Sequence, residues 1–278
     1  MVCGPTASGK SELSDALAER LTERHGTLVP TLVVDAMQVY EELPAITNQA
    51  RRRPAEMVGI VSVTQEWTVA HHKARAEEII GRTDTPFVLD AGTGMYLNAI
   101  LLDVPLAPKV PPQIRERAQE ISISGQNPRR AARAKELELA GAPERGSIWD
   151  GELRYATTIL YLRPDREALD ASIAKRSEKI ARKGLEEAAK IKELAQSGAG
   201  VNPSVLDSIG VRELIEYLAG ATTLDETTRR IGARTRRLAR RQMRWFDKLA
   251  RALQGRAKVT VAESPAAVEP ILPFALYA

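Results

Sequence analysis

The segment that most constrains the fold is GPTASGKS, residues 4–11, which only MVC precedes. It satisfies the pattern G-x-x-x-x-G-K-[ST] between a predicted strand and a predicted helix, the context that a phosphate-binding loop requires. Backbone N–H groups of the loop and the positive end of the following helix would hold an anion. Lys10 would add a point charge, and the Ser11 hydroxyl would bind Mg²⁺. The residues predicted to bind phosphate or diphosphate are Gly4, Thr6, Ala7, Ser8, Gly9, Lys10 and Ser11.

The first third of the chain alternates predicted strands and helices. Its apolar runs show no period-two alternation, which is typical of parallel strands covered on both faces. Aromatic residues make up only 4% of the chain, so the core must consist mostly of Leu, Ile, Val and Ala. The expected strands are 1–3, 31–36 and 86–94 (with a glycine turn), and the expected helices are 8–26, 69–83 and 95–105. We therefore predict an α/β fold with a parallel sheet core of the P-loop NTPase type.

The composition shifts at the proline-rich joint 105–113, where a boundary is expected. Beyond it lie predicted helices at 114–124 and 127–141, a strand at 156–162, and helices at 164–184, 185–198, 210–220 and from about 223 onward. We predict a first part of the core at 1–105 and a small helical insertion at 106–153. The core would be completed, with basic C-terminal helices, at 154–258, and 259–278 would be a tail to which the sequence assigns no role.

Positive charge is concentrated near the end of the chain. The net charge is only +4, but residues 229–256 contain ten arginines and Lys248 against the single acid Asp247. Such a surplus favours a polyanionic partner such as nucleic acid, with a solvated helix face as the alternative. Cations recur every three or four residues along one predicted stripe, at Arg230, Arg234, Arg237, Arg241, Arg244 and Lys248. The neighbouring face is apolar, and Trp245 and Phe246 are expected to be core residues rather than base-stacking platforms.

The compartment is also indicated by the sequence. The lone cysteine, Cys3, excludes an internal disulfide and fits a reducing cytoplasm. No signal peptide opens the chain and no apolar run approaches membrane-spanning length, so a soluble cytoplasmic protein is expected. Because only three residues precede the loop, the first strand should be truncated, and Met1 is expected to be a shortened or misassigned start.

Two acids follow predicted strands, Asp35 after TLVV and Asp90 after FVL. Either could play the part of the strand-end acid that holds Mg²⁺ in nucleotide hydrolases and kinases. On the chemistry of these residues alone, an ATP-dependent kinase stays open, although no nucleoside-monophosphate site or arginine lid follows either strand.

Several further motifs, taken together and in order, resemble the tRNA dimethylallyltransferase family. DAMQVY (35–40) resembles D-S-M-Q-V-Y, and DAGTGMYLNAIL (90–101) resembles G-G-T-G-L-Y followed by an apolar helix. NPRRAARAKEL (127–137), SIGVRELIEYLAG (208–220) and RRLARRQMRWF (236–246) match the family's later blocks, with Val211 and Arg244 as departures. The family's His-His segment is missing, because MVGIVSVTQEW (57–67) has no histidine. His71 and His72 come later, inside a helix, and are expected to be surface or packing residues.

The resemblance implies transfer of a dimethylallyl group from dimethylallyl diphosphate to N6 of the adenosine next to the anticodon in tRNA. It implies that Asp35 is the general base, with Thr6 and Arg212 as further catalytic residues and Mg²⁺ on Ser11. The implied tRNA-binding residues are Asp35, Ala36, Met37, Gln38, Thr93, Arg129, Arg130, Arg133, Arg234, Arg237 and Arg241. Partners would be the anticodon stem-loop and the prenyl diphosphate, with no membrane, and the protein is expected to be a monomer.

Alternatives remain at this point. The insertion is shorter than the family's, and in this respect the chain resembles the adenylate isopentenyltransferases, which prenylate free AMP, ADP or ATP. A P-loop kinase and an inactive tRNA-binding relative are the others. The basic stripe favours tRNA, whereas the short insertion favours free nucleotide.

Overall fold

The computed structural model describes residues 1–82, 84–120, 128–142 and 147–268. Its centre is a six-stranded sheet in the order β3-β2-β4-β1-β5-β6, in which every pair of neighbours is parallel. The strands are β1 (Val2–Cys3), β2 (Thr31–Val34), β3 (Ala55–Glu56), β4 (Val88–Ala91), β5 (Thr158–Leu162) and β6 (Lys258–Ala262). The predicted α/β class with a parallel sheet is confirmed.

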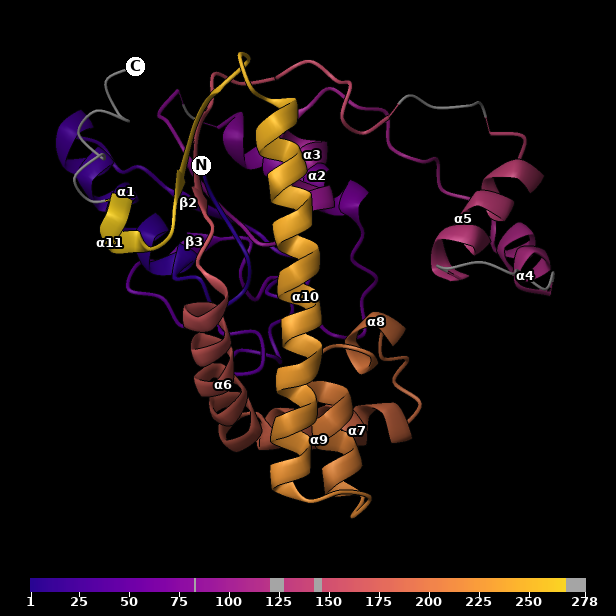
Figure 1. Cartoon of the computed structure of the whole chain (residues 1–278). Coiled ribbons are helices and arrows are strands. Elements are labelled where there is room, and N and C mark those ends of the chain that lie inside the picture. Colours follow the sequence, from indigo (N-terminus) through magenta and orange to yellow (C-terminus); the bar gives the residue numbers. More distant parts are fainter. Residues whose placement is uncertain (83, 121–127, 143–146, 269–278) are drawn as a thin grey trace.

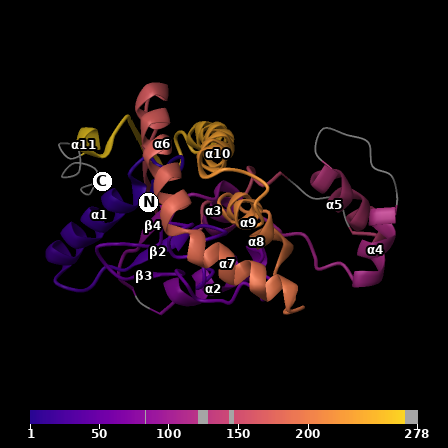
Figure 2. The ribbon, with the colours of Figure 1, turned by 90° about the horizontal axis from the view of Figure 1, so that it is seen from below.

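Helices cover both faces of the sheet (Figure 2). α1 (Lys10–His25) and α11 (Pro265–Val268) pack on one face, where Val2 and Leu160 point. α2 (Val69–Ile80), α3 (Gly94–Leu101) and the end of α10 (Leu224–Ala252) pack on the other, with Cys3 and Tyr161. Because neighbouring strand residues face opposite sides, two-sided burial requires the continuous apolar runs seen in the sequence.

A second core lies among the C-terminal helices (Figure 1). These are α6 (Arg166–Lys183), α7 (Leu185–Gln196), α8 (Pro203–Leu206), α9 (Val211–Leu218) and the start of α10. Tyr40, Leu43 and Ile46, from the segment after β2, are buried in this core. The chain that leaves β2 therefore joins the sheet to the C-terminal helices, and the cavity described below lies between them.

The insertion contains α4 (Pro112–Glu120) and α5 (Pro128–Leu139), which pack on each other. In Figure 1 this pair stands apart from the sheet. No helix in the described parts of the chain is long and apolar enough to span a bilayer.

Two strands were not expected from the sequence. β3 has two residues, too few for a pattern. β6 lies at the start of the segment expected to be a tail, so the boundary predicted at 258/259 falls inside a strand. β6 pairs with β5, with Lys258 beside Thr158 and Ala262 beside Leu162. Because β5 lies a hundred residues earlier in the chain, no local pattern reveals this pairing.

The two adjacent histidines of α2 have opposite surroundings, and both are helix residues as predicted. His71 is exposed. His72 is buried, and its Nδ1 accepts a 3.1 Å hydrogen bond from the Trp67 indole. Burial lowers the pKa of His72 from its ordinary 6.5 to about 4.

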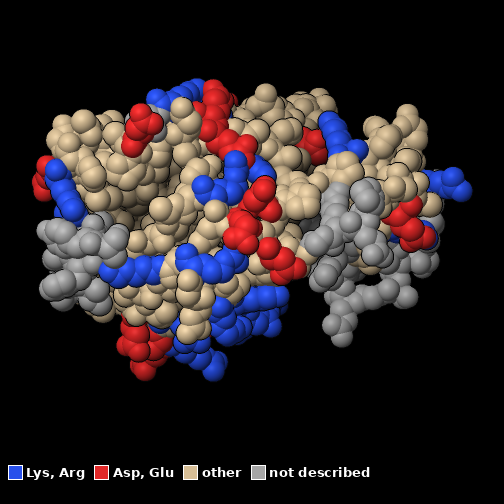
Figure 3. Space-filling model, turned by 90° about the horizontal axis from the view of Figure 1, so that it is seen from above, with Lys and Arg blue, Asp and Glu red and all other residues tan. Residues whose placement is uncertain are grey.

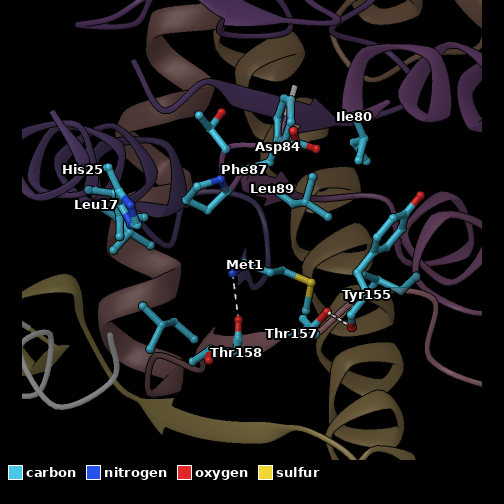
Figure 4. A pocket seen from close by; sticks show the side chains of 16 residues that line it. Met1, Leu17, His25, Ile80, Asp84, Phe87, Leu89, Tyr155, Thr157 and Thr158 are labelled. Carbon is cyan, nitrogen blue, oxygen red and sulfur yellow. Dashed lines mark hydrogen bonds between the residues drawn. The ribbon is translucent and has the colours of Figure 1, made fainter. Parts of the chain in front are cut away.

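A cavity of about 510 Å³ lies at the amino ends of the central strands (Figure 4). β1 pairs with only two residues of each neighbour, so Val88 and Thr158 extend past it. The cavity wall includes Phe87 and Leu89. The Met1 amino group donates a 2.7 Å hydrogen bond to the Thr158 carbonyl, and burial lowers the pKa of this amine to about 6. This cavity is at the opposite end of the strands from the loop at residues 4–11.

Candidate active site

The phosphate-binding loop follows β1 at the carboxyl edge of the sheet, where ligands bind in open α/β folds. Gly4 is required by close approach, since a Cβ there would lie 2.5 Å from the Leu162 carbonyl oxygen. Ala7 and Gly9 have positive φ angles of 65° and 85°, the left-handed conformation that turns successive backbone N–H groups inward. Gly9 caps α1 without a side chain, so the first amides of this helix are left for an anion.

Two half-buried cations line the cavity at the loop. Lys10 donates a 3.0 Å hydrogen bond from Nζ to the Pro5 carbonyl, and burial lowers its pKa while Asp90 and Asp35 act in the opposite direction. The pKa of Arg176, in α6, is lowered by burial, and the charge of Asp35 acts in the opposite direction. Sequence reasoning missed Arg176, because nothing local separates it from the other cations of a long polar helix.

Asp35 follows β2 and uses its two oxygens differently. Oδ1 accepts hydrogen bonds from the backbone N–H groups of Met37 (2.8 Å) and Gln38 (3.3 Å). Oδ2 lies against Gly92, where a Cβ would be only 2.8 Å away, and makes no hydrogen bond to the residues that the structure describes. Asp35 therefore caps its turn with one oxygen and leaves the other to accept a proton.

Gln242 of α10 connects the loops after β1 and β4. Its Oε1 accepts from the Thr6 N–H and its Nε2 donates to the Gly92 carbonyl, both at 2.8 Å. This glutamine belongs to the RRQMRWF block, but its sequence neighbours gave no indication that it would reach the loop.

The predicted metal ligand Ser11 has a different environment from the one expected. Its Oγ donates a 2.8 Å hydrogen bond to Oδ2 of Asp90, and Nη1 of Arg51 donates to the same oxygen at 2.7 Å. The strand-end acid is thus already paired with a buried cation. Over the described ranges, no group of three or more His, Cys, Asp and Glu side chains is arranged to hold a metal. These residues do not fit a protein-held Mg²⁺ at Ser11.

The loop and Asp35 open into one cavity of about 1240 Å³. The predicted site residues that line it are Thr6, Ala7, Ser8, Gly9, Lys10, Ser11, Asp35, Met37, Gln38, Arg234 and Arg241. Apolar side chains of Ile46, Leu169 and Ile180 also contribute to the wall. A phosphate-binding end, a carboxylate and apolar surface therefore share one space.

Some predicted residues lie elsewhere. Arg212, predicted to stabilise the leaving group, is not in the cavity wall; its side chain is 55% exposed and pairs with Glu216 (3.2 Å) and Asp207 (3.6 Å). Its place on the outward face of α9 explains the difference. The Thr93 hydroxyl accepts the Ala36 N–H at 3.1 Å, so it holds the turn after β2 rather than facing the cavity.

The predicted tRNA-binding arginines divide into paired and unpaired groups. Arg234 donates to buried Glu213 at 2.7 Å, and Arg133 pairs with Glu136 within α5. The predictions for Arg129 and Arg130 fall on side chains outside the described residues. Arg237 and Arg241 are exposed and form no ion pair with any described residue. Figure 3 shows basic side chains gathered along its lower edge, the side on which α10 lies.

The aromatic residues of α10 pack inward, as predicted. Phe246 is fully buried. Trp245 lies over Gly94, where a Cβ would be 2.2 Å from the indole, and donates from Nε1 to Asn98 at 3.1 Å.

The fold and the site define a P-loop α/β protein in which a strand-end carboxylate and a phosphate-binding loop line one cavity. The IPP transferase family model matches residues 38–249, and the chain belongs to this family. It is 62% identical over 265 residues to a tRNA dimethylallyltransferase of Rubrobacter xylanophilus, covering 95% of this chain and 91% of that protein. A tRNA dimethylallyltransferase of Thermobifida fusca is 32% identical, with coverage of 88% and 85%.

Solved structures agree on the fold. A eukaryotic dimethylallyltransferase, described as acting on tRNA, superposes with a TM-score of 0.73 at 22% identity, covering 96% of this chain and 74% of that one. The tRNA isopentenylpyrophosphate transferase of Bacillus halodurans gives 0.69 at 25% identity, covering 98% and 93%.

Proposed function

We propose that this chain transfers a dimethylallyl group from dimethylallyl diphosphate to N6 of the adenosine next to the anticodon in tRNA. The identity to tRNA dimethylallyltransferases supports tRNA over free adenylate as the acceptor. The observation that carries the proposal is that Asp35 and the phosphate-binding loop line the same cavity.

The reaction joins N6 of adenine to C1 of the prenyl group while the bond from C1 to the diphosphate oxygen breaks. The electron pair of that bond leaves with the diphosphate. An exocyclic amine is a weak nucleophile because its lone pair is delocalised into the purine, so removal of its proton assists the attack. Asp35 would accept that proton, which is supported by its two oxygens: Oδ1 is held by two backbone N–H groups, and Oδ2 makes no hydrogen bond to a described residue.

The leaving diphosphate gains charge on its bridging oxygen. The loop amides, Lys10 and Arg176 are fixed donors at the end of the cavity where this charge would develop, and donors fixed in advance lower the barrier most effectively. Thr6 would contact the same oxygen through its hydroxyl. The prenyl chain would lie against apolar side chains such as Met37, Ile46 and Ile180.

The acceptor adenine must leave the stack of the anticodon loop to enter the cavity. Gln38 would hydrogen-bond to the edge of this adenine. Its side chain is in the cavity wall, and its buried Oε1 has no hydrogen-bond partner among the described residues. The exposed arginines of α10 would hold the tRNA backbone without reading sequence. We also propose that the protein is a cytoplasmic monomer and that Mg²⁺ accompanies the diphosphate.

The test incubates the protein with dimethylallyl diphosphate and either tRNA or AMP, and then identifies modified nucleosides by mass. We expect dimethylallyladenosine in digested tRNA, at the position next to the anticodon, and no prenylated AMP. Prenylated AMP with unmodified tRNA would replace the proposal by an adenylate isopentenyltransferase. No product from either acceptor would favour an inactive relative.

A further inference from the structure

A buried arginine from the segment after β2 reaches the phosphate-binding loop from behind. The Arg51 side chain is only 4% exposed. Nε and Nη2 donate to Oδ1 of Asp15 at 3.1 and 2.7 Å, and Nη1 donates to Oδ2 of Asp90 at 2.7 Å. Nη2 also approaches the Ser11 carbonyl at 3.3 Å. Four of the five N–H groups of the guanidinium are thereby accounted for, and the fifth is on Nη1.

This arginine contacts the groups that normally bind a divalent cation. In P-loop proteins, the Ser or Thr hydroxyl after the loop lysine and a strand-end Asp together hold Mg²⁺. Here these groups are Ser11 and Asp90, which are hydrogen-bonded to each other. The Asp90 oxygen that accepts from Ser11 is the one bonded to Arg51, so a fixed positive charge already lies beside the pair.

Arg51 is held there by a second buried carboxylate. Asp15 of α1 is 3% exposed, and its other oxygen accepts the Arg52 backbone N–H at 3.1 Å. A metal that displaced Arg51 would leave Asp15 buried without its cation, which is strongly unfavourable. Arg51 also lines the cavity beside Lys10 and Ser11, so its positive charge lies next to the space that a bound anion would occupy.

We propose that Arg51 is a built-in cation of the diphosphate site, in place of a divalent metal held by Ser11 and Asp90. Diphosphate then binds to the loop amides, Lys10, Arg176 and Arg51 without needing a metal coordinated by the protein. Any Mg²⁺ that accompanies the diphosphate is bound by the substrate's own oxygens and by water. The inference rests on the proposed function for the diphosphate site and adds which residue supplies its positive charge.

The experiment uses inorganic pyrophosphate as the probe and isothermal calorimetry as the readout, with EDTA or with a fixed excess of Mg²⁺. Comparison of variants at the same Mg²⁺ concentration cancels the formation of magnesium pyrophosphate in solution. The variants are Ser11→Ala, the double variant Asp15→Leu with Arg51→Met, and the double variant combined with Ser11→Ala. The double variant removes Arg51 together with Asp15, which would otherwise stay buried without its cation. Asp90 loses Arg51 but keeps the hydrogen bond from Ser11.

For the wild type we expect pyrophosphate binding in EDTA, and we expect Ser11→Ala to weaken binding by the same factor with and without Mg²⁺. The double variant should lose about tenfold or more of its affinity in EDTA. Mg²⁺ should restore its binding, and this rescue should disappear when Ser11→Ala is added. Arg53→Gln is the matched control, because Arg53 lies two positions from Arg51 but is outside the cavity wall and donates to the Thr22 hydroxyl at 3.3 Å; it should behave as wild type.

The contrary results are distinct. If Ser11→Ala in the wild-type background removes a Mg²⁺-dependent gain of tenfold or more, Ser11 holds a metal and the inference is wrong. This comparison does not depend on whether the double variant folds. If the wild type binds no pyrophosphate in either buffer, or if Lys10→Ala binds it unchanged, the diphosphate site of the proposed function itself fails.

Discussion

The two ends of the cavity use arginine in opposite ways. At the loop, the Arg51 side chain is buried and bonded to two carboxylates, and Arg176 is half-buried near Asp35. On α10, Arg237 and Arg241 are exposed and form no ion pair with described residues. Buried, fixed charge acts at short range and is little affected by salt, whereas exposed charge attracts a polyanion from a distance and is screened. Under the proposed function, the buried end would carry the chemistry and the exposed face would bind tRNA.

The largest effect is expected at the carboxylate between these regions. Asp35→Asn should lower turnover by about 10²–10⁴-fold, the range for loss of a general base. Asparagine retains an oxygen for the Met37 and Gln38 N–H groups, so the turn and both substrate affinities should persist. Single-turnover kinetics with saturating substrates measures the change. A variant within a few-fold of wild type would reduce Asp35 to a capping residue.

The adjacent histidines of α2 repeat the contrast between buried and exposed charge. The pKa of His72 is about 4 in the folded state and 6.5 ordinarily, so the unfolded chain binds its proton first as pH falls. Burial of neutral His72 therefore does not lower the free energy of unfolding above pH 6.5. As pH falls from 6.5 to 4, this residue should lower the free energy of unfolding by about 3 kcal/mol. When denaturant unfolding is measured between pH 4 and 6.5, the free energy of unfolding should change less steeply with pH for His72→Gln than for wild type. His71→Gln, on the exposed side, should keep the wild-type slope; equal slopes for all three proteins would contradict the assignment.

At the loop, Lys10→Ala removes one fixed charge from the buried end. The affinity for dimethylallyl diphosphate should fall roughly tenfold to a hundredfold, as when a hydrogen bond to a charged group is removed. Equilibrium binding in EDTA gives the value without a metal contribution. An unchanged affinity would mean that the anion does not enter the loop.

The exposed face should respond to salt instead. Replacing Arg237, Arg241 and Arg244 by Gln should flatten the slope of log tRNA affinity against log salt by about 0.7–0.9 for each phosphate that the variant no longer binds. Arg234→Gln is the informative comparison, because its partner Glu213 is buried and would lose its cation. That variant should have a lower free energy of unfolding but the same dependence of tRNA affinity on salt as wild type. The same slope in the triple variant and wild type would make the α10 arginines a solvated surface.

The sequence predicted the features that depend on neighbouring residues and missed those that depend on residues far apart in the chain. The loop at 4–11, the helix that follows it and Asp35 at a strand end are local patterns, and each lies where expected. Two features depend on contacts between segments 36 to more than 100 residues apart: Arg51 beside Asp15 and Asp90, and Arg176 near Asp35 in the cavity wall. No local pattern in RRR at 51–53 or KR at 175–176 reveals them. The stripe on α10 was predicted by spacing, but spacing could not show that Glu213 pairs with Arg234.

The most direct test of this division is a crossed titration of two variants with two ligands. The affinities of Lys10→Ala and of a double variant, Arg237→Gln with Arg244→Gln, are measured for dimethylallyl diphosphate and for tRNA, in one buffer; these two arginines are exposed and lie outside the cavity wall. We predict that Lys10→Ala weakens only the diphosphate and that the double variant weakens only tRNA, each leaving the other affinity within about twofold, as expected for sites that do not share partners. Comparable losses of both affinities in either variant would contradict the division, because a single charged surface would then serve both ligands.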